Sequence, residues 1–265
     1  MERAIMRSYL VGIWAARYFF VHLAGAELRY KFRRSRLGLL WTMVTPLVLA
    51  LMMTFVLGNL LGVNMKDYAP YIFSGLLVWE FITGSVVGGC SSLLGSEPYI
   101  KQYLHPFAIY PLKTTLVNIT SFLIALMGLA IWILFYKPEN LLVAVFALPV
   151  SALCLFLFGW PVATLTAFTN LKYRDFAQIA ALGMQLLWYA SPVFFQPAMF
   201  KTAGLALMLE LNPVTHLLNL LRAPMLYGQF PSLTDYAYVL GTAAVFYVLA
   251  AIRIRSSEKT LIFYF

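Results

Sequence analysis

The chain has 265 residues, of which 62% are hydrophobic and 11% are charged, and its mean hydropathy is +0.81. Soluble domains carry about 25% charged residues, so the composition excludes an ordinary soluble protein and predicts an integral membrane protein. The net charge of +9 is not accompanied by a motif that reads nucleic acid. We therefore expect no nucleic-acid partner, and we attribute the charge to contact with anionic membrane lipids.

In chain order, the first long stretch is Ser8–Leu28, which is apolar but interrupted by Arg17 and His22. Aromatic residues crowd its middle, and this pattern predicts an amphipathic helix in the cytoplasmic interface rather than a span. A basic cluster from Arg29 to Arg36 follows. Because no charge appears again until Lys66, this cluster is at least a topology anchor for the first span.

Six apolar runs then follow, and a helix needs about 20 such residues to cross a membrane. Their continuity excludes barrel strands, which alternate over about 10 residues. The sequence therefore predicts an all-α integral membrane protein with one domain of six transmembrane helices. The predicted spans are Leu37–Gly62, Tyr71–Leu94, Thr114–Tyr136, Leu141–Phe168, Phe176–Phe195 and Tyr236–Ile252.

The segment Gln196–Asp235 lies between the fifth and sixth predicted spans and is divided by four prolines. Its apolar pieces are too short to span, so we expect re-entrant helices on the outer side, covered by protein or lining a cavity. With both termini in the cytoplasm, 15 of the 19 Lys and Arg residues lie inside, as the positive-inside rule requires. The four predicted outside are Lys66, Lys137, Lys201 and Arg222.

Residues with catalytic potential are sparse. Cys90 and Cys154 are expected to be buried free thiols, and the histidines show no metal-binding spacing. The chain has no GxxxxGK[ST] motif, so it cannot bind ATP through a P-loop of its own. Glu80 is the only acid inside a predicted span. It is either a functional residue or a hydrogen-bonded glutamate between helices.

Aromatic residues make up 16% of the chain. Most are expected in interface belts and helix packing. A second interpretation is a path for sugars, since aromatic faces stack on pyranose rings. The residues proposed for this glycan path are Trp79, Glu80, Tyr189, Phe194 and Phe195.

Several motifs occur in the order of a known family. "RYKFRRSRLGLLW" resembles the first-helix signature of the ABC-2 permeases that export O-antigen, capsule and teichoic acid. "SEPYIKQYLHPFAIYPLK" is similar to that family's loop between helices two and three, although Gln102 stands where a second basic residue is usual. "TNLKYRDFAQI" looks like the family's (F/Y)RD turn, and "SPVFF" and "NPVTHLLNLLRAPMLYG" resemble its outer end. The matching residues are Arg29, Tyr30, Ser35, Leu37, Gly38, Trp41, Ile100, Lys101, Pro106, Pro111, Tyr173, Arg174 and Asp175.

The resemblance implies a homodimer in the bacterial inner membrane, joined to two P-loop ATPase subunits. ATP and Mg would bind to those partners, so this chain would bind no cofactor and would be a transport subunit rather than an enzyme. The cargo would be a polysaccharide on undecaprenyl diphosphate, and the resemblance alone favours O-antigen. Arg33, Arg34 and Arg36 would attract the diphosphate, because arginine suits phosphate oxygens.

The loop 95–113 would couple the permease to the ATPase, with a short helix near Tyr99–Leu104. Its expected contact residues are Glu97, Tyr99, Ile100, Lys101 and Tyr103, and the turn Tyr173, Arg174 and Asp175 is the other inner loop.

Other classes remain open at this point. They are a capsule or teichoic-acid exporter of the same family, a small-lipid or drug exporter, a membrane-embedded polyprenyl-phosphate transferase, and an assembly protein without transport activity. A transferase would need clustered acids or histidines near the interface.

Overall fold

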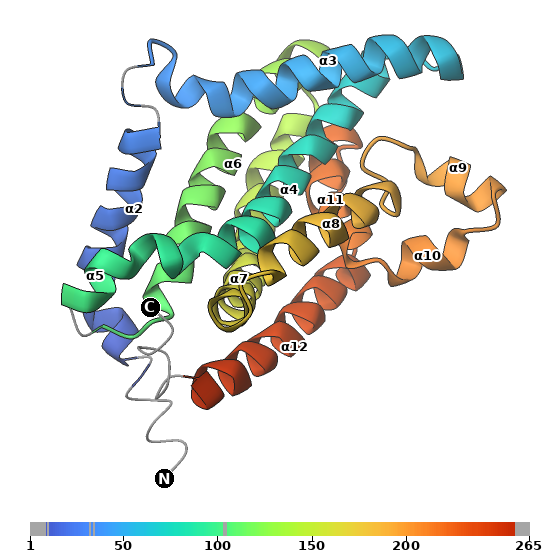
Figure 1. Ribbon diagram of the computed structural model, residues 1–265. Coiled ribbons are helices and arrows are strands. Elements are labelled where there is room, and N and C mark those ends of the chain that lie inside the picture. Colours follow the sequence, from blue (N-terminus) through green and yellow to red (C-terminus); the bar gives the residue numbers. More distant parts are fainter. Residues whose placement is uncertain (1–8, 10, 32, 34, 103–104, 258–265) are drawn as a thin grey trace.

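The computed structural model describes residues 9, 11–31, 33, 35–102 and 105–257. Every regular element within these residues is helical (Figure 1). The all-α class predicted from the sequence is therefore confirmed. Among the predicted functional residues, Arg34 and Tyr103 lie outside the described residues, as does Ser8 at the start of the predicted interfacial helix.

Within the described residues, five helices are long and apolar enough to cross a membrane. Most extend beyond the uncharged runs, because a helix does not have to stop where the hydrocarbon ends. In the second of them, for example, Asn64 accepts a hydrogen bond from Lys66 N and caps the helix before the apolar run begins. The five are α3 (Trp41–Leu61, preceded by η1, Gly38–Leu40), α4 (Met65–Ser92), α6 (Ile109–Tyr136), α7 (Asn140–Lys172) and α12 (Leu233–Ser257).

The fifth predicted span is shorter than the sequence suggests. Helix α8 (Phe176–Tyr189) has 14 residues, which corresponds to about 21 Å, whereas the hydrocarbon core is about 30 Å thick. The apolar run continues to Phe195, but residues 190–196 form turns. Pro192 accounts for this, because the residue before a proline is disfavoured in the helical conformation. Six spans thus remain a prediction at this helix.

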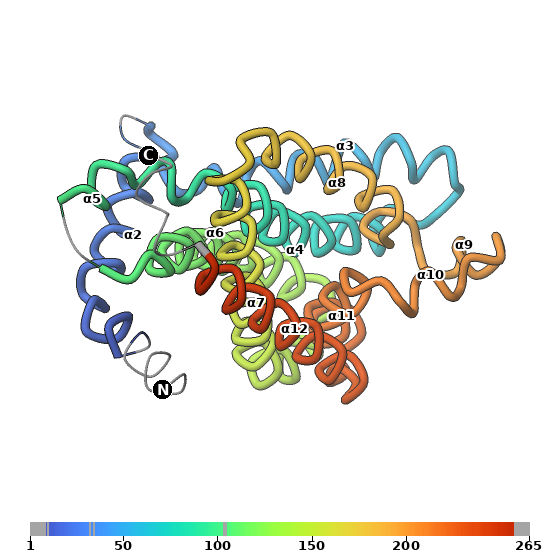
Figure 2. Tube along the Cα trace, turned by 60° about the horizontal axis from the view of Figure 1, so that its bottom comes forward, coloured from blue at the N-terminus to red at the C-terminus, as the bar shows by residue number. Residues whose placement is uncertain are grey.

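The remaining helices gather at the two ends of the bundle (Figure 2). At one end, α2 (Arg17–Lys31) lies crosswise to the long helices (Figure 1), beside η2 (Leu94–Ser96) and α5 (Glu97–Gln102). At the other end, α9 (Pro197–Thr202) and α10 (Ala206–Leu211) extend beyond the bundle. Helix α11 (Pro213–Leu226) instead packs among α4, α7 and α12. The prediction that this segment re-enters the membrane is not tested by the arrangement.

Helix α4 forms the centre of the core. Two thirds of its apolar window is buried (67%), compared with 17% for α3. Small residues allow α7 to approach it closely, as is common between membrane helices. A Cβ added at Gly89 would lie 2.7 Å from Ala163 Cα, and one added at Gly159 would lie 2.6 Å from the Phe81 ring. Larger residues at these two glycines would push α4 and α7 apart.

A second, smaller cluster attaches α2 to the bundle. Phe20 of α2 is buried in a cluster that also contains Ile109 and Phe168. The buried ammonium of Lys113 lies 2.5 Å from Glu27 Oε2. Tyr18, also in α2, is 75% exposed. An exposed aromatic of this kind suits a lipid–water interface.

Candidate functional site

The connection between α2 and α3 carries the predicted basic entrance. The Ser35 hydroxyl accepts hydrogen bonds from Gly38 N (3.3 Å) and Trp41 Nε1 (3.1 Å). Gly38 has φ +51°, a conformation that favours glycine. This turn explains the spacing of Ser35, Gly38 and Trp41 in the first motif. It leaves Arg33 and Arg36 exposed at the end of the bundle that also carries α5.

The five residues predicted to form one glycan path occupy separate places. Trp79 and Phe194 belong to a packed aromatic cluster, whereas Tyr189 is 62% exposed. Glu80 lines a different space, a cavity between α3, α4 and α6. Neighbouring residues on a helix point about 100° apart, so Trp79 and Glu80 face different surroundings. A single path through all five therefore remains a prediction.

The aromatic cluster extends through a series of ring contacts. The Trp79 and Trp188 ring centroids are 4.9 Å apart, and those of Trp188 and Phe194 are 5.7 Å apart. Phe194 is 4.2 Å from Phe195, which in turn lies 6.5 Å from Phe200. The cluster joins α4 and α8 to the loop before α9. These rings pack against one another as well as offering possible stacking faces.

The Glu80 cavity has a volume of about 480 Å³. Glu80 itself is exposed, so the carboxylate is accessible from outside. Five of the lining residues have uncharged polar side chains, and an ionisable residue such as Glu80 is rare between membrane helices. The polar lining residues are Lys31, Thr42, Thr45, Glu80, Thr83, Asn118 and Ser121.

Arg222, one of the four cations predicted on the outer side, is buried, with 3% of its surface exposed. Its guanidinium donates to Pro192 O (2.6 Å), Val193 O (2.7 Å) and the Tyr71 hydroxyl (3.1 Å). It also donates to Ser74 Oγ (3.3 Å) and to Tyr71 O (3.2 Å). Its Cζ lies 3.7 Å from the centroid of the Tyr71 ring.

These contacts make Arg222 a clamp that fixes the loop after α8 to α4. None of the ion pairs found in the described ranges includes Arg222, so backbone carbonyls satisfy this cation. Gly75 makes room for it, since a Cβ there would lie 2.7 Å from Arg222 Nη2. Burial lowers the pKa of the guanidinium, but arginine keeps its charge in proteins. The only signal in the sequence was an isolated arginine in an apolar helix.

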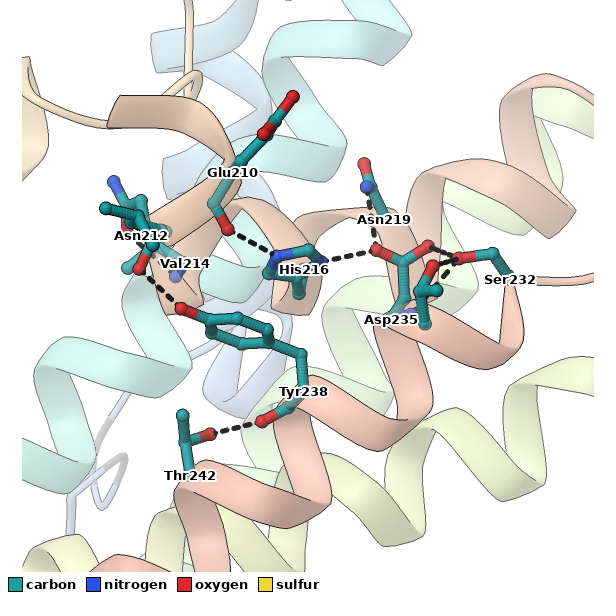
Figure 3. Close-up of polar contacts among 11 residues, drawn as sticks. Glu210, Asn212, Val214, His216, Asn219, Ser232, Asp235, Tyr238 and Thr242 are labelled. Carbon is teal, nitrogen blue, oxygen red and sulfur yellow. Dashed lines mark hydrogen bonds and ion pairs between the residues drawn. The ribbon is translucent and has the colours of Figure 1, made fainter. Parts of the chain in front are cut away.

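A second polar network joins the outer segment to α12 (Figure 3). His216 Nδ1 lies 2.7 Å from Asp235 Oδ1, and His216 Nε2 lies 3.0 Å from Glu210 O. Asn219 donates to the same Asp235 oxygen at 3.0 Å. Ser232 Oγ donates to the other oxygen of Asp235 and accepts from Asp235 N, which caps the start of α12. This network holds α10, α11 and α12 together.

The loop between α4 and α6, which is predicted to face the cytoplasm, contains the six-residue helix α5. Lys101 Nζ lies 2.5 Å from Glu97 Oε1 on the same exposed face. Tyr99 is 40% exposed, and its ring contacts Phe19 at 6.3 Å. Ile100 packs against the cluster that holds α2. Helix α5 therefore rests on the N-terminal part of the chain and keeps Tyr99 and Lys101 accessible.

The turn between α7 and α8 contains the predicted Tyr173, Arg174 and Asp175, which are all exposed. Asn170 organises this turn, because its side chain accepts from Ala177 N (3.0 Å) and donates to Cys90 O (2.9 Å). The turn is thereby tied to the inner end of α4. Across the parts of the chain that the structure describes, no group of three or more His, Cys, Asp and Glu side chains has a metal-binding arrangement.

Together these features define a multi-pass α-helical membrane protein with an accessible basic end and an opposite end closed by buried polar contacts. No family model matches the chain. It is 25% identical over 239 residues to an O-antigen export system permease protein RfbA of Myxococcus xanthus, covering 89% of this chain and 90% of that protein. It is also 23% and 22% identical over 175 residues to two proteins of the same name from Klebsiella pneumoniae, covering 66% of this chain and 68% of each.

These three similarities, together with the order of the motifs, support an assignment of the chain to the ABC-2 type permeases that export polysaccharides. The names of these relatives and the long apolar helices support a membrane permease of the ABC transporter type.

Proposed function

We propose that this chain is the membrane subunit of an ABC exporter that carries a lipid-linked polysaccharide across the bacterial inner membrane. O-antigen on undecaprenyl diphosphate is the substrate we favour. The observation that carries this proposal is the alignment of nearly the whole chain with an O-antigen export permease. The basic motif before α3 supports it, because a long lipid-linked anion needs a cationic entrance.

The motor is proposed to be a separate P-loop ATPase, present in two copies, that binds ATP and Mg. Helix α5 is its docking surface, because it lies at the same end as α2 and exposes Tyr99 and Lys101. The turn at Tyr173 lies next to the inner end of α4 through Asn170. An ATPase contact at this turn would therefore be transmitted to α4.

The permease is proposed to work as a homodimer with both termini in the cytoplasm. Helix α3 supports the dimer, because it is largely unburied in the single chain and exposes apolar side chains such as Met52 and Phe55. The orientation follows from the basic residues around α2 and α5, since cytoplasmic segments carry the excess of Lys and Arg.

A capsule or teichoic-acid exporter of the same family is the alternative within this class. A polyprenyl-phosphate transferase is less favoured by the geometry. The acid–histidine contact between His216 and Asp235 is engaged with Asn219, Ser232 and the Glu210 carbonyl. The contact between His216 and Asp235 therefore links α11 to α12.

The experiment combines a gene deletion with affinity purification. Deletion should remove a surface polysaccharide and accumulate its undecaprenyl-linked precursor inside the cell, and the tagged permease should co-purify with a P-loop ATPase. Analysis of the accumulated glycan separates O-antigen from capsule and teichoic acid. Normal surface glycan in the deletion strain, without an accumulated precursor, would overturn the proposal.

A further inference from the structure

The cavity between α3, α4 and α6 contains buried polar atoms that have no partner. These are Thr83 Oγ1, Asn118 Nδ2 and Ser121 Oγ, and all three belong to residues that line the cavity. Unpaired buried polar groups are costly and rare, so each one needs an explanation. The volume of about 480 Å³ falls within the range of small-molecule sites. The cavity is therefore suited to a polar ligand.

A glycine in α4 leaves space for the Asn118 side chain beside the cavity. A Cβ added at Gly84 would lie 2.8 Å from Asn118 Nδ2. Glycine at this position therefore allows the Asn118 amide to lie against α4. The cavity is consequently built from the close approach of α4 and α6, with α3 forming its third side.

The charges in the cavity lining have both signs. Glu80 supplies a carboxylate, and Lys31 lies near enough to act on it electrostatically. A ligand that carries only negative charge, such as a diphosphate or an anionic lipid, would be repelled by Glu80. A neutral sugar does not require the cation. A ligand with one positive and one negative group matches both side chains.

The position of the cavity indicates where such a ligand comes from. Thr42 and Thr45 lie in the first turns of α3, and Lys31 is the last residue of α2, which lies across this end of the bundle. The cavity therefore extends from the end of the bundle where α3 begins, near the level at which a spanning helix meets lipid headgroups, to Glu80 near the middle of α4. Leu77 and Phe122 add apolar lining, against which the start of an acyl chain can pack.

We propose that this cavity binds the headgroup of a zwitterionic phospholipid of the phosphatidylethanolamine type. The phosphate accepts from Lys31 and from the donors of Thr83, Asn118 and Ser121, while the ammonium donates to Glu80. The ethanolamine is distinguished from choline because its ammonium keeps N–H donors. Bound lipid would stabilise the junction of α2, α3 and α4.

The test measures lipid retention and is independent of any export activity. Purified protein is equilibrated with equal amounts of phosphatidylethanolamine, phosphatidylglycerol and phosphatidylcholine, and the lipid that stays bound is identified by native mass spectrometry. We expect about one phosphatidylethanolamine per chain above the non-specific background. Glu80→Gln and Asn118→Leu should each lower this retention about tenfold, because a charge-assisted bond or a cavity donor is lost. Glu139→Gln is the matched control, since it removes one exposed carboxylate outside the cavity.

Thr83→Val and Ser121→Ala provide the same comparison if Glu80→Gln does not purify as a folded protein, because they remove cavity hydroxyls with little change of shape. Three results would overturn the proposal. They are equal retention by the wild type and the cavity variants, equal retention of phosphatidylglycerol, and no retained lipid at all. The last result would indicate a cavity occupied by water. Displacement of the bound lipid by short glycans would instead assign the cavity to sugar.

Discussion

Replacing Arg222 with methionine would remove the clamp between the loop after α8 and helix α4. Methionine has a similar reach but donates no hydrogen bond. Val193 O has Arg222 as its donor, whereas Pro192 O also accepts from the Tyr71 hydroxyl. An orphaned carbonyl costs about 1–3 kcal/mol, and a hydrogen bond to a charged group contributes about 1.5–3 kcal/mol. Because the variant no longer has to bury a cation, we expect a net loss of about 2–4 kcal/mol rather than the full sum.

Thermal unfolding in detergent measures this loss of stability. For a chain of roughly this size, 1 kcal/mol shifts the melting temperature by about 2–4 °C, so a loss of about 2–4 kcal/mol corresponds to a decrease of about 4–16 °C. Limited proteolysis adds a local readout, because the segment 190–212 should be cleaved faster when it is no longer fixed to α4. Arg222→Lys should recover little, since an ammonium cannot reproduce the planar fork of contacts.

Lys201→Met is the control, because it removes one exposed cation from α9 in the same outer segment. It should leave both the melting temperature and the cleavage pattern unchanged. If Arg222→Met unfolds at the same temperature as this control, Arg222 does not hold the loop, and the hydrogen bonds that define the clamp make no net contribution to stability.

Three further predictions concern the proposed transport. Changing Arg33, Arg34 and Arg36 together to Gln should lower export while tagged termini report an unchanged topology; normal export would leave only the anchor role. Tyr99→Ala combined with Tyr103→Ala should weaken ATPase co-purification about tenfold, as expected for an interface hot spot, and unchanged assembly together with unchanged export would contradict the coupling role. Tyr189→Ala should slow export without loss of folded dimer, whereas Phe195→Ala should also cost up to about 3 kcal/mol of stability because its ring is packed. If both variants lose export and folded dimer to the same extent, Tyr189 is a packing residue.

The positions of the five long helices were predictable from the sequence, because hydrophobic composition determines which segments can span a membrane. Uncharged runs located the five long helices, because the bilayer requires about 20 apolar residues. Their ends were less predictable, since capping by Asn64 and polar helical turns lie outside the apolar runs. The fifth run remains a prediction, because its apolar stretch includes a turn at Pro192 as well as the helix α8. Hydropathy alone does not separate these two conformations.

The candidate site was harder to predict because its parts depend on tertiary contacts. Glu80 was singled out as the only acid inside a predicted span, and it lines a cavity, whereas Trp79 packs in the aromatic cluster. Hydropathy does not show this difference, which comes from the rotation between adjacent helical residues. Counting lysines and arginines placed Arg222 on the outer side of the membrane, but such counting does not show whether a cation is solvated or buried. Its actual partners are carbonyls of the distant Pro192 and Val193. Only the fold brings these groups within reach of the guanidinium.

Helix α4 connects the features on which these proposals rest. Near its start, Tyr71, Ser74 and Gly75 form the Arg222 clamp. Glu80 then lines the cavity, and the helix ends at η2, which leads directly into α5. A displacement of α5 that moves α4 as a unit must therefore change the cavity and the clamp together. Loss of the clamp should consequently uncouple the outer loop from α5 while leaving ATPase docking intact, so that Arg222→Met reduces export without reducing ATPase co-purification.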